Sequence, residues 1–240
     1  MKTIGLIGGM SWESTSLYYQ VINGEVARRR GGLHSAPMHL ISLDFGDIAA
    51  RQRADDWDGM AQILVSAARR LEEGGAGCIL IATNTMHKLA PQVQSAVGVP
   101  LLHIADVTAH AISGRGLRTV GLLGTRFTME QPFYVERLAR HGVSCVVPGE
   151  AERAEVHRII FEELCRGQCL ESSRRALQEI CQGLAAQGAQ GIVLGCTELP
   201  LILRDPGVAV PLFDTTTLHA MAAVDFALIE QEATSAALGA

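Results

Sequence analysis

Two residues able to move protons, Thr83 and Cys196, each stand directly after a short apolar segment, Ile79–Ala82 and Ile192–Gly195. A thiol is partly ionised near neutral pH and can act as a base, whereas a threonine hydroxyl is a poor base that can still donate a proton. A lone cysteine at a strand end usually only packs. The match to Thr83, the adjacent Gly195 and the predicted helix that follows favour a function for Cys196. We expect the N-terminus of that helix to lower the thiol pKa from ~8.5 toward ~3.5–7.5.

Hydrogen-bonding groups accompany both residues. Asn84 and Thr85 follow Thr83, and Thr197 and Glu198 follow Cys196. A third segment, Gly5–Trp12, is rich in glycine and precedes a predicted helix, so its bare N–H groups can form an anion pocket. It lacks the G-x-G-x-x-G spacing of a dinucleotide site. The tight strand-to-helix turn also predicts that Ser11 caps the helix.

The remaining polar candidates give weaker signals. His87 and His103 could each be a base, but no Cys/His/Asn or Ser/His/Asp order supports this, and we expect surface or capping histidines. Arg51 and Gln52 lie in a polar segment that could fold over a site, although solvated surface is the default expectation for both. No Cys/His spacing indicates zinc.

Short apolar segments alternate with amphipathic stretches along the chain, which predicts parallel sheets covered on both faces and an α/β fold. Three segment pairs recur in order at spacings of 111 to 116 residues: 3–8 with 119–124, 79–83 with 192–196, and 99–103 with 210–214. Ordered repetition indicates a duplicated unit. We expect two Rossmann-like domains related by a pseudo-two-fold axis, with the site in the cleft between them. The expected domains are residues 1–105 plus a returning helix within 215–240, and residues 106–214.

Composition excludes several classes of function. The 240 residues carry a formal net charge of −5, and the longest cationic run, Arg28–Arg30, suits a helix end, so we expect no nucleic-acid partner. No apolar run approaches the ~20 residues that a membrane span requires. Six scattered cysteines are typical of reduced thiols, so we expect a cytoplasmic protein.

Three motifs, Ile4-Gly-Leu-Ile-Gly-Gly-Met-Ser-Trp-Glu-Ser-Thr15, Ile81-Ala-Thr-Asn-Thr-Met-His87 and Leu194-Gly-Cys-Thr-Glu-Leu199, resemble the signatures of the aspartate/glutamate racemase superfamily. The first points to the aspartate racemase branch, and the similarity covers nearly the whole chain. The resemblance implies two Rossmann-like domains and the absence of pyridoxal phosphate, metal and nucleotide as cofactors. It also implies a small acidic amino-acid substrate, and related racemases are often dimers, which makes a homodimer one expected state.

In the family, two cysteines flank the substrate Cα, because stereoinversion needs acid/base groups on opposite faces. The second of these matches Cys196, whereas the first matches Thr83, a departure from the family pattern. We expect Cys196 to be the base toward one enantiomer, which a branch with the same Thr/Cys pair indicates to be the L form. Thr83 then delivers the proton on the other face, and the reverse direction is expected to be slow.

The resemblance also assigns substrate contacts. The carboxylates are expected at the Met10 and Ser11 main chain, at Asn84 and Thr85, and at the N–H groups of Thr197 and Glu198. Arg166 is the candidate clamp on the distal carboxylate, although a helix-end cation before Gly167 is an equal alternative. Gln52 stands where a second polar contact is expected, and its neutrality could admit other amino acids.

Two other functions remain open. A one-base decarboxylase of substituted malonates needs only one cysteine, but is not expected to keep the Asn84–Thr85 pair. A catalytically retired amino-acid-binding protein would bind its ligand without exchanging the α-hydrogen. Exchange into L-aspartate or L-glutamate from deuterated water separates both from a racemase.

Overall fold

The computed structural model describes residues 1–203 and 207–238, with side chains as far as residue 229. The last two residues of the returning segment expected at 215–240 therefore lie outside the described residues. The chain divides into two compact units, Met1–His103 with His219–Ala240, and Ile104–Leu218. Each has its own sheet and core, and each is described by itself.

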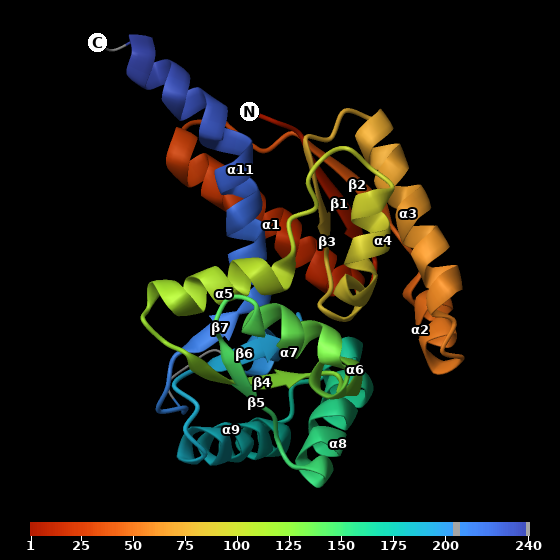
Figure 1. The fold of residues 1–240 in the computed structure, drawn as a ribbon, viewed down its shortest axis with the longest axis vertical. Coiled ribbons are helices and arrows are strands. Elements are labelled where there is room, and N and C mark those ends of the chain that lie inside the picture. The colour runs from red at the N-terminus through yellow and green to blue at the C-terminus, as the bar shows by residue number, and fades with distance from the viewer. Residues whose placement is uncertain (204–206, 239–240) are drawn as a thin grey trace. The chain divides into compact units, whose positions relative to one another are not determined.

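The N-terminal unit is built on a parallel sheet of order β2-β1-β3 (Figure 1). Its elements are β1 (Ile4–Gly8), α1 (Trp12–Arg30), β2 (Met38–Ser42), α2 (Phe45–Arg53), α3 (Trp57–Glu73), β3 (Cys78–Ile81), the 3₁₀ helix η1 (Thr85–Leu89), α4 (Ala90–Ser95) and the helix α11 (Thr215–Leu238), which enters this unit at His219.

Strand alternation sends side chains of the N-terminal sheet to two cores. Ile4 and Leu6 point to one face, where they pack with α1 and the returning helix α11. Ile7 and Ile79 point to the other, where α3 and α4 cover them. Figure 1 shows α1 beside α11, and α3 beside α4. Strand β2 is the edge strand and is partly exposed, which departs from the expectation that every strand is covered on both faces.

The C-terminal unit holds a parallel sheet of order β5-β4-β6-β7. Its elements are α5 (Ile104–Gly114), β4 (Thr119–Gly124), α6 (Arg126–Glu130), α7 (Pro132–Ala139), β5 (Ser144–Val146), α8 (Glu150–Arg158), the π-helix η2 (Ile159–Glu163), the 3₁₀ helix η3 (Leu164–Arg166), α9 (Glu171–Ala186), β6 (Ile192–Gly195), α10 (Leu199–Ile202) and β7 (Leu212–Asp214). Helices α5 and α7 cover one face, and α8, η2 and α9 cover the other.

The strand pairings in the two sheets match each other at the positions where the sequence segments repeat. In the first unit Gly5 pairs with Ile79, and in the second Gly121 pairs with Ile192. A bridge from Ile79 to Leu101 has its counterpart in the pairing of Ile192 with Leu212. The predicted α/β fold with two parallel-sheet domains is confirmed. Thr83 and Cys196 therefore follow equivalent strands, each within its own unit.

Candidate active site

Thr83 lies just beyond β3 at the carboxyl edge of the first sheet. Its side chain is half-buried, and its N–H donates to the carbonyl of Ile81 at 2.8 Å. Its own carbonyl accepts from Nδ1 of His87 at 2.8 Å. Asn84 and Thr85 follow at the start of η1, and both are buried. The backbone at Thr83 is thus held from both sides.

The glycine-rich turn after β1 reaches the same sheet edge, because β1 and β3 are neighbours. Gly9 has φ +85°, and a Cβ there would lie 2.1 Å from the carbonyl oxygen of Leu43, so only glycine fits. Its N–H donates to Oγ1 of Thr15 at 2.8 Å. Ser11 caps α1 by accepting the N–H of Ser14 at 3.3 Å, which confirms the predicted cap. Met10 is buried beside it, and the anion pocket at this turn stays a prediction.

Gln52 is in α2, and its side chain is 8% exposed. The expectation of a solvated surface position is therefore wrong for this residue: the amphipathic helix turns it inward with Ile48. Its neighbour Arg51 forms an ion pair with Asp56, the N-cap of α3. A polar side chain this deep has lost its hydrogen bonds to bulk water. Its burial costs little free energy only when another hydrogen-bonding group, such as that of a ligand, replaces the water.

Cys196 lies directly after β6 and is 7% exposed. Its Sγ donates to Oε2 of Glu198 at 2.9 Å. The same oxygen accepts the Thr197 hydroxyl at 3.0 Å. Thr197 and Glu198 are 4% exposed, so this thiol–carboxylate pair is buried. Sequence reasoning assigned only the backbone N–H of Glu198 and missed its side chain, although the Cys-Thr-Glu spacing was a visible signal.

The electrostatics around Cys196 overturn the expected thiol activation. Burial raises the pKa of Cys196 well above the ordinary value of a thiol, and the carboxylate of Glu198 raises it further. The N–H of Glu198 opposes this effect without reversing it. The helix expected to lower the pKa, α10, has only four residues, so its dipole is small. Cys196 is therefore a protonated thiol at rest.

Arg166 is exposed at the last position of η3. Gly167 follows with φ +71°, so Arg166 occupies the helix-end position of the alternative interpretation. Its segment lies near the thiol, because Cys165 packs against the core that contains Cys196 and contributes to its raised pKa. Contact between Arg166 and a substrate carboxylate stays a prediction.

His87 is 2% exposed, so the expected surface position is wrong. Its ring centroid lies 4.7 Å from that of His103 and 5.5 Å from that of His219. His219, on α11, is fully buried and bonded to Tyr18. No sequence signal singled out His219, because it lies more than a hundred residues from His87 along the chain and the two meet only in the folded structure.

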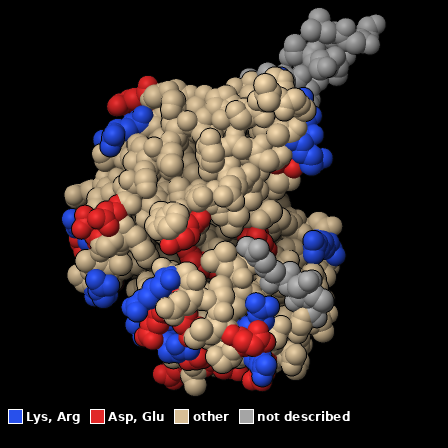
Figure 2. All heavy atoms as spheres, turned by 180° about the vertical axis from the view of Figure 1, so that it is seen from behind, with Lys and Arg blue, Asp and Glu red and all other residues tan. Residues whose placement is uncertain are grey.

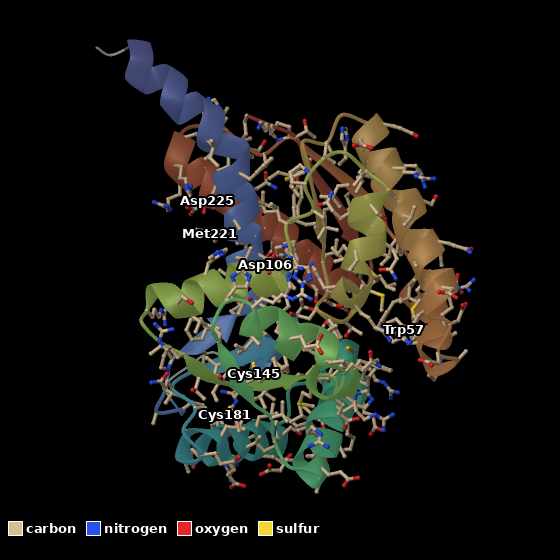
Figure 3. All side chains as sticks on the ribbon, viewed as in Figure 1. Trp57, Asp106, Cys145, Cys181, Met221 and Asp225 are labelled. Atoms are coloured by element: carbon tan, nitrogen blue, oxygen red, sulfur yellow. The ribbon has the colours of Figure 1, made fainter. Side chains whose placement is uncertain are left out.

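Charged side chains of both signs are interspersed, and blue and red spheres lie beside one another in Figure 2. One ion pair joins α5 and α7, where Asp106, labelled in Figure 3, lies 2.6 Å from Arg137. Among residues 1–203 and 207–238, no helix has the length and apolar character of a membrane span. Within the same described part of the chain, no cluster of three His, Cys, Asp or Glu side chains suits a metal ion.

Residues 7–223 match the family model described as Asp/Glu/Hydantoin racemase. A broad-specificity amino-acid racemase of Bacillus subtilis is 24% identical over 95% of this chain and 99% of its own. A candidate Asp/Glu racemase from Yersinia pestis has a crystal structure with a TM-score of 0.90 and 51% identity, covering 95% of this chain and all of that one. An aspartate racemase homologue from Pyrococcus horikoshii has a TM-score of 0.81 and 38% identity, over 95% and 99% of the two chains.

Proposed function

The chain belongs to the Asp/Glu/hydantoin racemase family, and we propose that it racemises acidic amino acids, with Cys196 and Thr83 acting on opposite faces of the substrate Cα. The membership makes it an isomerase, an amino-acid racemase. The proposal adds the substrate class and the two residues that move the proton.

One observation carries this assignment: the hydrogen bond of 2.9 Å from Cys196 to Glu198, in a buried position directly after β6. A thiol can act as a base only after it has been deprotonated. The raised pKa of Cys196 means that its thiolate is scarce in the resting protein, so a proton acceptor is required. Glu198 is within reach of that proton. We therefore assign Glu198 as the acceptor that converts the thiol into the reactive base.

The proton balance follows from this pair. Glu198 takes the Cys196 proton, and the thiolate removes the Cα proton to give a thiol and a substrate carbanion. Thr83 donates its hydroxyl proton to the opposite face of the carbanion. Solvent then returns a proton to the Thr83 alkoxide and removes one from Glu198, which restores the resting state.

The polar groups at each sheet edge have complementary tasks. Asn84, Thr85 and the turn of Met10 and Ser11 bind the substrate carboxylates, and their preorganised donors stabilise the enolate-like charge as it forms. Arg166 binds the distal carboxylate, and Gln52 is a second polar contact. L-aspartate and L-glutamate are the proposed substrates.

The test is a screen of L- and D-amino acids in deuterated water, with chiral separation and detection of α-deuterium. The proposal requires deuterated product of the opposite configuration from aspartate or glutamate, and none from the Cys196→Ala variant. A decarboxylase or a retired binding protein would give neither exchange nor inversion. Exchange that survives in Cys196→Ala would exclude the assigned base.

A further inference from the structure

We infer that His87 is a positioning residue for Thr83, and that His219 of the returning helix α11 holds the His87 ring in place. This inference rests on the proposed function, because it assigns Thr83 the task of inverting the configuration at Cα. All the residues involved belong to the N-terminal unit.

The contact between His87 and Thr83 has a defined direction. Nδ1 of His87 lies 2.8 Å from the Thr83 carbonyl oxygen, and a carbonyl only accepts, so Nδ1 carries the hydrogen. The backbone at Thr83 is therefore fixed by a bond from four residues ahead. Because Oγ1 is two bonds from Cα, the direction of the hydroxyl depends on this backbone and on one side-chain torsion.

His219 is fixed in the same way. Its Nε2 lies 2.7 Å from the carbonyl oxygen of Leu102 and must donate. Because burial keeps the ring neutral, Nδ1 accepts from the Tyr18 hydroxyl at 2.8 Å. Both ring nitrogens are thus used, and the ring is neutral. Burial, with repulsion by His87 second, lowers the pKa of His219 to about 3. A neutral ring with both nitrogens bonded cannot turn without losing a buried hydrogen bond.

The His87 ring contacts two other imidazoles. The His219 ring meets it at an interplanar angle of 68°, and the His103 ring meets it at 61°. His219 reaches this position because α11 packs into the core with α1. Asp225, further along the same helix, is exposed and takes no part in this core (Figure 3). The returning helix α11 therefore supports the Thr83 backbone indirectly, through the ring of His219 and then the ring of His87.

This arrangement predicts a specific defect. Cys196 lies in the other unit. In the proposed mechanism it exchanges the α-hydrogen on its own face without help from Thr83. Loss of the His87 bond should therefore reduce inversion and spare exchange with retention. A general loss of folding would reduce both reactions together.

The experiment compares His87→Asn, His87→Gln and His87→Leu. Asparagine places an N–H donor as many bonds from Cα as Nδ1 of histidine, glutamine places it one bond further, and leucine has none. Each protein reacts in deuterated water with L-aspartate, the enantiomer that Cys196 deprotonates in the proposed mechanism. Initial rates of exchange with retention and of inversion are measured, and Thr83→Val provides the reference for exchange without inversion.

We expect the ratio of inversion to retention to fall about tenfold or more in His87→Leu and His87→Gln, in line with the sensitivity of catalysis to small displacements. His87→Asn should stay within about twofold of the unaltered protein. His219→Leu should shift the ratio in the same direction as His87→Leu, whereas Asp225→Asn, which removes an exposed charge on the same helix, should not.

Equal ratios in the Asn and Gln variants, or a parallel loss of both reactions in folded His87→Leu, would overturn the positioning role. Thermal unfolding of each variant establishes that it is folded. If the unaltered protein shows neither reaction, the proposed racemisation fails first and the positioning role fails with it.

Discussion

Replacing Glu198 by glutamine should speed the chemical modification of Cys196 and slow racemisation, two effects of opposite sign. At rest, Sγ of Cys196 and Oε2 of Glu198 are 2.9 Å apart. If both were charged, their repulsion at an effective dielectric constant of ~20 would be roughly 6 kcal/mol, equivalent to roughly four pKa units. Relaxation reduces this upper bound, but removal of the carboxylate should lower the thiol pKa by at least about one unit.

The assay pairs two measurements on Glu198→Gln. Thiolate abundance is read from the rate of alkylation by iodoacetamide at pH 7, with the modified cysteine identified by mass spectrometry. We expect alkylation of Cys196 to accelerate about tenfold or more, since each unit of pKa changes the thiolate fraction tenfold. Racemisation should nevertheless fall by about 10²–10⁴-fold, the usual contribution of a general base. The carboxylates of the bound substrate keep Cys196 protonated during turnover, and a glutamine cannot take its proton.

The matched control is Glu179→Gln, an exposed glutamate of α9 in the same unit. It should change neither rate. Slower alkylation of Cys196 in Glu198→Gln would refute the electrostatic argument. Unchanged racemisation in that variant would refute the assignment of Glu198 as proton acceptor, even if alkylation accelerates as expected.

Three further predictions use other parts of the molecule. Replacing Arg166 by methionine should raise the KM for aspartate about tenfold with little change in kcat, as expected for a charge that binds the distal carboxylate; an unchanged KM would favour the helix-end role. Thr83→Cys should increase turnover of D-aspartate, measured by polarimetry, because a thiol is a better base than a hydroxyl. The free energy of unfolding should decrease between about pH 9 and 12, because burial raises the pKa of Cys78, Cys145 and Cys181 to about 12, so the folded state keeps protons that the unfolded state has lost. Cys181→Ala should make this decrease shallower in chemical denaturation at several pH values, and an unchanged slope would contradict it.

The fold was accessible to sequence reasoning because its signals are local and repeated. Apolar segments at matching spacings predicted the strands, and the pairings of Gly5 with Ile79 and of Gly121 with Ile192 follow the same repeats. Capping chemistry located the start of α1 at Ser11. The partial exposure of β2 was not accessible, because the edge position of a strand depends on topology.

The chemistry at Cys196 shows where such reasoning ends. A cysteine before a predicted helix is typical of an activated thiol, but the sign of the pKa shift depends on burial, on the length of α10 and on the direction of the Glu198 side chain. None of these is encoded by spacing alone. The environment of His87 could not be predicted from spacing either, because its contact with His219 forms only when α11 packs against the N-terminal unit.

If Thr83 and Cys196 act as proposed, their unlike chemistry does not make the enzyme one-directional, and the expected slow reverse reaction can apply to kcat but not to kcat/KM. The two enantiomers of an amino acid have equal free energies in water, so kcat/KM must be the same in both directions whatever the groups are. Asymmetry is confined to kcat and KM taken separately, through unequal binding of the enantiomers or unequal resting proton states. Glu198 provides a proton acceptor for Cys196, so the state ready for the enantiomer that Cys196 deprotonates forms by a local proton shift. The state ready for the other enantiomer requires an ionised Thr83 hydroxyl, which is rarely populated, so turnover from that side should show both the lower kcat and the lower KM.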